Sequence, residues 1–111
     1  MGGQPQSGGI SPPQSQAAGK KLIRYGSPDT VEKLAEDAAR AEASLGHHGV
    51  SAILRNPPSF PHGQAEFDEV GMAFPIIQTG KNPHHFTIIL PKPITQAVAD
   101  LFNSVFKPLG P

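Results

Sequence analysis

The stretch from Ser27 to Gly46, SPDTVEKLAEDAARAEASLG, decides the fold class of this chain. A serine, a proline and an acid in succession are typical of a helix start, with Ser27 as the capping residue and Pro28 at the first helical position. One helical face is apolar and consists of Val31, Leu34, Ala35, Ala38, Ala41 and Leu45. The solvent side is predicted to carry the i,i+4 pairs Asp29/Lys33, Lys33/Asp37 and Glu36/Arg40. We therefore predict an amphipathic helix that ends at Gly46.

Four segments around this helix have the composition or the alternation of strands: Lys21–Tyr25, His48–Arg55, Met72–Thr79 and His85–Leu90. Pro75 lacks a backbone donor, which places the third of these strands at a sheet edge or a bulge. A last helix is predicted from Thr95 to Lys107, and Phe86, Phe102 and Phe106 are predicted to lie in the core. The order β-α-β-β-β-α predicts an α+β domain, in which an N-terminal and a C-terminal helix pack on a small, mainly antiparallel sheet of about three to four strands.

Residues 1–19 differ in composition from the rest of the chain. They contain five Gly, three Pro, four Gln and three Ser, and no charged residue. Such a segment buries too little apolar surface to offset the entropy lost on ordering, so we predict a disordered leader. Residues 20–111 then form a single domain. A flexible leader of this kind is typical of a linker that precedes a C-terminal module of a longer protein.

The composition excludes several classes of site. The chain has 111 residues, nine Lys and Arg, nine Asp and Glu, and no cysteine, so disulfides and cysteine-ligated metals are absent. No apolar run reaches the roughly 18 residues of a membrane span, and no signal peptide opens the chain. We expect no membrane association, and a location in the cytoplasm or secretion as the C-terminal part of a larger effector.

Five histidines are the main source of candidate chemistry: His47, His48, His62, His84 and His85. Neighbouring strand residues point to opposite faces, so each histidine doublet can give only one ligand to a shared metal. The chain also lacks the H-E-x-x-H pattern and any pair of histidines spaced by four residues on a helix. We therefore predict neither a metal site nor a cofactor.

Metal-free acid–base chemistry on RNA fits the histidines better. Cleavage needs a base and an acid that work near neutral pH, a cation for the phosphorane charge and hydroxyl groups that orient the phosphate. The predicted catalytic residues are His48, His85, Lys81 and Thr87. The predicted substrate contacts are Arg55, Ser51 and His84.

The layout of leader, small α+β domain and polar residues at the strand ends is similar to the toxin modules at the C-termini of bacterial polymorphic toxin systems. This resemblance implies a small α+β nuclease. It also implies a neutralising partner protein of the immunity type.

Two other functions remain open from the residues alone. The first is a non-catalytic interaction module, which would present the proline-rich loop 56–71 to a partner. The second is ADP-ribosyl transfer, in which an arginine on a first strand, a serine on the strand after a helix and a Gln/Glu-x-Glu turn act together. Arg24, Ser51 and Gln64-Ala65-Glu66 occur in that order.

Overall fold

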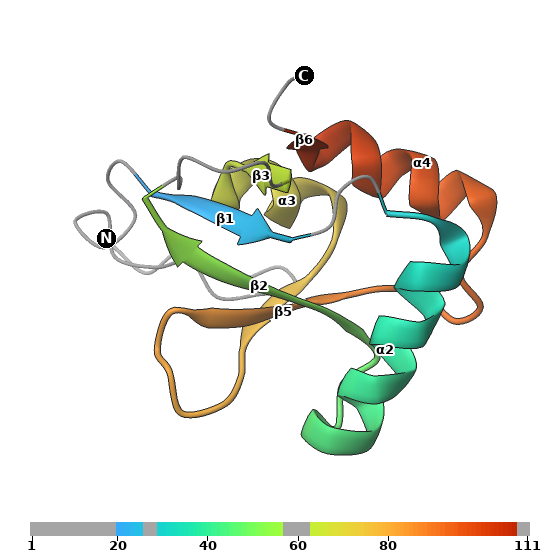
Figure 1. The fold of residues 1–111 in the computed structure, drawn as a ribbon, viewed down its shortest axis with the longest axis horizontal. Coiled ribbons are helices and arrows are strands. Elements are labelled where there is room, and N and C mark those ends of the chain that lie inside the picture. The colour runs from blue at the N-terminus through green and yellow to red at the C-terminus, as the bar shows by residue number, and fades with distance from the viewer. Residues whose placement is uncertain (1–19, 26–28, 57–62, 109–111) are drawn as a thin grey trace, which may run out of the picture.

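The computed structural model describes residues 20–25, 29–56 and 63–108 (Figure 1). Their elements, in chain order, are β1 (Lys21–Arg24), α2 (Val31–Leu45), β2 (Gly49–Arg55), β3 (Gly63–Ala65), α3 (Phe67–Ala73), β4 (Ile76–Gln78), β5 (His85–Ile89), α4 (Gln96–Val105) and β6 (Lys107–Pro108). The predicted leader 1–19 lies outside the described residues. Among the described helices, none is both long and apolar enough to cross a membrane.

The described strands form one antiparallel sheet in the order β4-β5-β2-β1-β3-β6. The α+β class, the antiparallel sheet and the first and last helices are as predicted. The sheet is larger than the predicted three to four strands, because six described strands pair. β3 and β6 have three and two residues, too few to show an alternation in the sequence. Helix α3 is a further addition, and it includes Met72, which the prediction assigned to a strand.

Helix α2 begins later than its sequence pattern predicts. The hydroxyl of Thr30 accepts a hydrogen bond from the Lys33 backbone N–H at 3.0 Å, so Thr30 and not Ser27 caps the helix. Ser27 and Pro28 lie outside the described residues. Gly46 ends the helix in the left-handed conformation, with φ of 81°, as its position predicts. The predicted ion pair of Asp29 with Lys33 is present at 3.3 Å, but Asp29 itself is buried because it also turns inward to an arginine described below.

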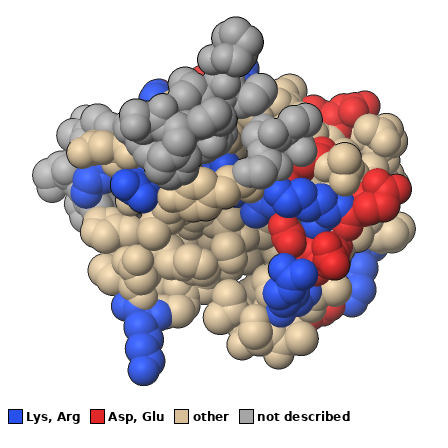
Figure 2. Space-filling model, viewed as in Figure 1, with Lys and Arg blue, Asp and Glu red and all other residues tan. Residues whose placement is uncertain are grey.

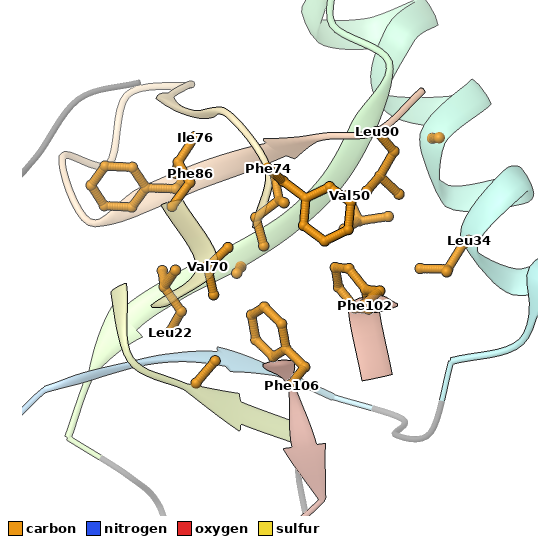
Figure 3. Packing of buried hydrophobic residues seen from close by; sticks show 14 of the residues in the cluster. Leu22, Leu34, Val50, Val70, Phe74, Ile76, Phe86, Leu90, Phe102 and Phe106 are labelled. Atoms are coloured by element: carbon orange, nitrogen blue, oxygen red, sulfur yellow. The ribbon is translucent and has the colours of Figure 1, made fainter. Parts of the chain in front are cut away.

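The core lies on one face of the sheet, which we call the inner face (Figure 3). All three described helices contribute to it, with Leu34 and Ala38 from α2, Phe67 and Val70 from α3, and Ala99 and Phe102 from α4. The sheet supplies Leu22, Val50, Ala52, Leu54, Ala65, Ile76, Phe86 and Ile88. The rings of Phe102 and Phe106 stack with centroids 4.9 Å apart. The predicted core positions of Phe86, Phe102 and Phe106 are therefore confirmed.

Residues that alternate with these core positions lie on the opposite, outer face of the sheet, since successive strand side chains point to opposite sides. The outer face carries Lys21, Ile23, Ser51, Ile53, Arg55, Gln64, Ile77, His85, Thr87 and Ile89. The buried apolar side chains of the described helices pack on the inner face. The outer face is thus the side of the sheet on which polar groups predicted to have a function meet.

Candidate functional site

His48 and His85 do not form an acid–base pair. The register pairs Gly49 with Ile89 at one end of β2–β5 and Ile53 with His85 at the other. Four residue steps separate these pairs, or about 13 Å at the rise of a strand, and His48 lies one residue beyond Gly49. Its Nδ1 lies 3.1 Å from the carbonyl oxygen of Leu90. The structure therefore does not bring the two predicted catalytic histidines together.

His85 is held by a chain of hydrogen bonds on the outer face. Its Nδ1 lies 3.1 Å from the Thr79 carbonyl oxygen and 3.0 Å from the Thr79 hydroxyl. The Thr79 hydroxyl lies in turn 2.8 Å from the hydroxyl of Thr87. A carbonyl oxygen can only accept, so this contact is a hydrogen bond in the tautomer that carries its proton on Nδ1. In the neutral ring, Nε2 then carries no proton and can accept one.

The loop between β4 and β5 is held in place beside His85 by hydrogen bonds. The Gln78 side-chain amide donates to three backbone carbonyls of the loop, those of Thr79, Gly80 and Asn82, at 3.0 to 3.1 Å. Gly80 has φ of 77°, and a Cβ there would lie 3.9 Å from His85 Nδ1. Lys81 follows directly and is exposed. The loop thus holds the Lys81 backbone beside the imidazole, as the predicted turn requires.

Most of the predicted site residues gather around this loop. Ser51 is the cross-strand partner of Thr87, and Arg55 lies two residues beyond Ile53, the partner of His85. The Leu54 N–H donates to the His84 carbonyl at 2.9 Å, which holds the end of β2 beside His84.

Thr87 is not accessible on the outer face. Its side chain is fully buried, so it cannot touch a ligand. Its hydroxyl contacts Thr79, which in turn contacts the ring of His85. The Thr87 hydroxyl thus belongs to the hydrogen-bond chain that leads to His85 and does not face the solvent.

Tyr25 is a site residue that the sequence reasoning missed. Half of it is exposed, and its hydroxyl accepts a hydrogen bond from Arg55 Nη1 at 3.3 Å. The alternation Lys21, Ile23, Tyr25 in the first strand could have revealed it, because it places the tyrosine on the same side as Lys21. Tyr25 directly follows the last residue of β1, whereas Arg55 is the cross-strand partner of Lys21, the first residue of β1. The contact between their side chains therefore runs along the length of β1 on the outer face.

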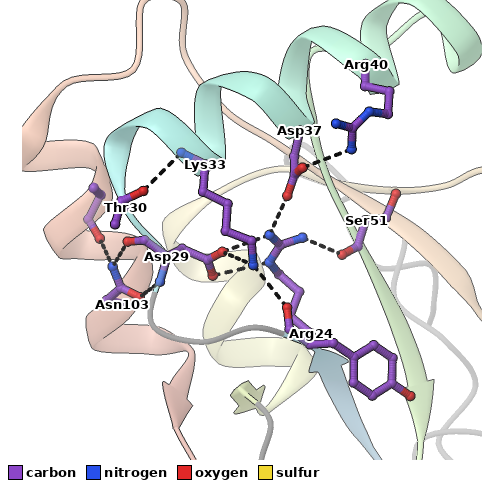
Figure 4. A network of polar contacts seen from close by, with 10 residues as sticks. Arg24, Asp29, Thr30, Lys33, Asp37, Arg40, Ser51 and Asn103 are labelled. Atoms are coloured by element: carbon purple, nitrogen blue, oxygen red, sulfur yellow. Dashed lines mark hydrogen bonds and ion pairs between the residues drawn. The ribbon is translucent and has the colours of Figure 1, made fainter.

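Arg24 is held in a buried ionic network at the end of β1 (Figure 4). Its Nε and Nη2 contact the Asp29 carboxylate at 3.2 and 2.8 Å, and Nη2 also contacts Asp37 at 2.8 Å. Nη1 donates to the Ser51 carbonyl oxygen at 3.0 Å. Burial alone would lower the pKa of Arg24, but the hydrogen bonds and charges of Asp29 and Asp37 together raise it. The side chain is therefore a fixed cation that joins β1, β2 and α2.

This network contains two of the residues that the sequence suggested for ADP-ribosyl transfer, Arg24 and Ser51. Arg24 and the backbone of Ser51 are in contact, and a pocket of about 250 Å³ opens beside them, under α2. Glu66 follows Ala65, which pairs with Leu22, and it forms an ion pair with Lys21. Three residue steps of strand, about 10 Å, separate the Arg24 and Glu66 positions. The structure thus joins two of these groups and leaves the carboxylate apart.

The predicted loop 56–71 is only partly a loop. Residues 63–65 form β3, and residues 67–71 belong to α3, whose first turn contains Asp68 and Glu69. Residues 57–62, with their prolines, lie outside the described residues. The acidic residues of this segment therefore lie at a helix N-terminus, where negative charge is favourable.

No three His, Asp or Glu side chains within residues 20–25, 29–56 and 63–108 gather in a way that could hold a metal ion. The best-organised polar group on the outer face is the chain from Thr87 through Thr79 to His85, with Ser51, Arg55 and Tyr25 near it. Comparison with known proteins gives no relative: no protein family model, no curated protein and no solved structure matches this chain.

Proposed function

We propose that the domain is a toxin-like ribonuclease that works without a metal and uses His85 as its catalytic imidazole. The observation that carries the proposal is the hydrogen-bond chain from Thr87 through Thr79 to His85 Nδ1. This chain orients the ring and leaves Nε2 as a proton acceptor. Both threonine side chains are buried, so the orientation does not depend on exposed groups.

The proposed reaction is an internal transfer of the phosphate. His85 Nε2 takes the proton of a ribose 2′-hydroxyl, and the 2′ oxygen attacks phosphorus. The bond from phosphorus to the 5′ oxygen breaks, and that oxygen takes a proton from water. Lys81 and Arg55 oppose the charge that builds up on the phosphate, and Ser51 contacts it through its hydroxyl. The products are a 2′,3′-cyclic phosphate and a 5′-hydroxyl end.

The distribution of charge supports this role. In Figure 2, Lys and Arg atoms stand out at left and at lower left, where the β4–β5 loop projects, with no Asp or Glu atoms beside them. On the right, over α2, positive and negative atoms mix, in keeping with the ion pairs of Asp37 and Glu36 with Arg40. The chain as a whole has no net charge, but the side near the β4–β5 loop carries more positive than negative charge (Figure 2). Such an excess favours contact with the phosphates of RNA.

Cleavage of RNA by the full chain tests the proposal. Changing His85→Gln removes the proton acceptor, and we expect the cleavage rate to fall by at least about a hundredfold. Product analysis should show cyclic phosphate ends. The matched control is His48→Gln, which changes the same residue type at the other end of the β2–β5 pair and should leave the rate unchanged. Equal rates for the two variants, or no cleavage by the wild-type chain, would contradict the proposal.

Thr79 is expected to act as a positioning residue. Changing Thr79→Val keeps the volume but removes the hydroxyl that contacts both His85 and Thr87. We expect kcat to fall by about tenfold, the equivalent of one hydrogen bond, with little change in KM. Thr79→Ser should restore kcat because it restores the hydroxyl. A Ser variant as slow as the Val variant, at equal stability, would show that the hydroxyl does not orient the ring.

A further inference from the structure

Tyr25 has an exposure unlike that of the other described aromatic residues. The five phenylalanines in the described part of the chain are at most 7 % exposed, whereas Tyr25 is 50 % exposed. Tyr25 therefore does not contribute to the hydrophobic core in the way that the phenylalanines do. It stands on the sheet side that also carries His85.

The ring of Tyr25 is anchored by a cation. Arg55 Nη1 donates to the Tyr25 hydroxyl at 3.3 Å, although the two residues lie toward opposite ends of the β1–β2 pair. Ile23 and Ile53 are cross-strand partners on the same face, and they lie between Tyr25 and Arg55. The side chains of Tyr25 and Arg55 therefore meet above these two isoleucines. Ile23 is only 1 % exposed. The accessible surface on β1 and β2 is therefore formed by Tyr25, Arg55 and the partly exposed Ile53, with Ile23 buried beneath it.

This surface adjoins the imidazole of the proposed active site. Ile53 is the direct cross-strand partner of His85, and neighbouring strands lie about 4.8 Å apart. A ligand that covers Ile53 therefore reaches His85 by crossing a single strand spacing. The order across the sheet, from β1 through β2 to β5, is aromatic ring, guanidinium and imidazole.

We propose that Tyr25 and Arg55 form a binding site for single-stranded RNA, in which a base stacks on the Tyr25 ring and a neighbouring phosphate contacts the Arg55 guanidinium. This inference rests on the proposed function and adds the class of its substrate. Unpaired bases expose the aromatic faces that such a ring requires, whereas the bases of a duplex stack on each other. Arg55 adds positive charge for the backbone while its hydrogen bond fixes the ring.

Binding is tested with the full chain and a fluorescent single-stranded RNA oligonucleotide that carries 2′-O-methyl groups, because this probe has no attacking hydroxyl. Fluorescence anisotropy measures Kd for the wild type and for Tyr25→Ala, Tyr25→Phe and Arg55→Ala. We expect Tyr25→Ala to weaken binding by about tenfold or more, in keeping with the loss of one stacked base. Tyr25→Phe keeps the ring and should stay within about threefold of the wild type.

Two further readouts complete the experiment. Arg55→Ala should weaken binding and make Kd less dependent on salt, because a phosphate contact is lost. A double-stranded probe of the same sequence should bind more weakly than the single strand. The inference is overturned if the single strand does not bind, if Tyr25→Ala binds it like the wild type, or if the duplex binds as well. Binding that needs Tyr25 in a protein that does not cleave RNA would support the inference and refute the proposed nuclease.

Discussion

Changing Gly49→Ala should lower the free energy of unfolding by about 3 kcal/mol or more, because the added methyl group has no space. A Cβ at Gly49 would lie 2.2 Å from the backbone oxygen of Ile88 and 2.9 Å from a methyl carbon of Thr87. The backbone of β5 cannot rotate away as a side chain can, so β2 and β5 must move apart. That movement breaks the pairing at the centre of the sheet.

Urea denaturation followed by circular dichroism measures this loss, and Gly71→Ala provides the matched control. Gly71 lies in α3, and a Cβ there meets one side-chain carbon of Ile76 at 3.7 Å, an ordinary contact. The control should stabilise the protein by about 0.5 to 1 kcal/mol, since alanine is the better helix former. If Gly49→Ala were as stable as the wild type, the close approach of β2 to β5 would be wrong.

Changing Arg24→Met should lower the free energy of unfolding by about 3 to 5 kcal/mol, the usual result when one partner of a buried ion pair is removed. Methionine fills part of the volume but leaves the buried Asp29 carboxylate, at 4 % exposure, with only the partly exposed Lys33 as a cation, at 3.3 Å. Asp29 also anchors α4, because Asn103 accepts from its N–H at 3.0 Å and donates to its carbonyl oxygen. The substitution is therefore expected to weaken the packing of β1, α2 and α4 against one another.

The control for Arg24 is the second arginine that contacts Asp37. Arg40 lies 3.2 Å from this carboxylate, but its side chain is 67 % exposed. Changing Arg40→Met should alter stability by less than about 1 kcal/mol, because water screens an exposed pair. The same urea experiment compares the two variants. Similar losses for Arg24→Met and Arg40→Met would contradict the assignment of Arg24 as the ion that holds β1 to α2.

The elements with a strong local period could be predicted from the sequence. The apolar stripe of α2 and the alternation in β2 and β5 follow from the burial of one side of each element, which is a property of neighbouring residues. The core positions of Phe86, Phe102 and Phe106 follow from the same patterns, whereas those of Phe67 and Phe74 were not predicted. The predicted edge position of the strand after Pro75 is likewise confirmed, because β4 pairs only with β5 among the described strands.

What depends on residues far apart in the chain was decided by the tertiary structure. β3 and β6 are too short to carry a pattern, and they exist because β1 offers β3 an edge and β3 offers one to β6. The cap of α2 is Thr30 and not Ser27, and Asp29 just before this cap turns its carboxylate inward to Arg24. The two short strands leave no signal in a local window of sequence, whereas Thr30 is itself a capping residue type that competes locally with Ser27.

The candidate site divides in the same way. The sequence by itself determined the residue types that could do chemistry. The placement of Lys81 in the turn just before His85 also followed from local structure. Only the register of β2 on β5 separated His48 from His85, and only the pairing of β1 with β2 brought Tyr25 to Arg55. The physical reason is that side-chain type and turn chemistry are local, whereas the distance between two strands' residues is set by which strands pair and in which register.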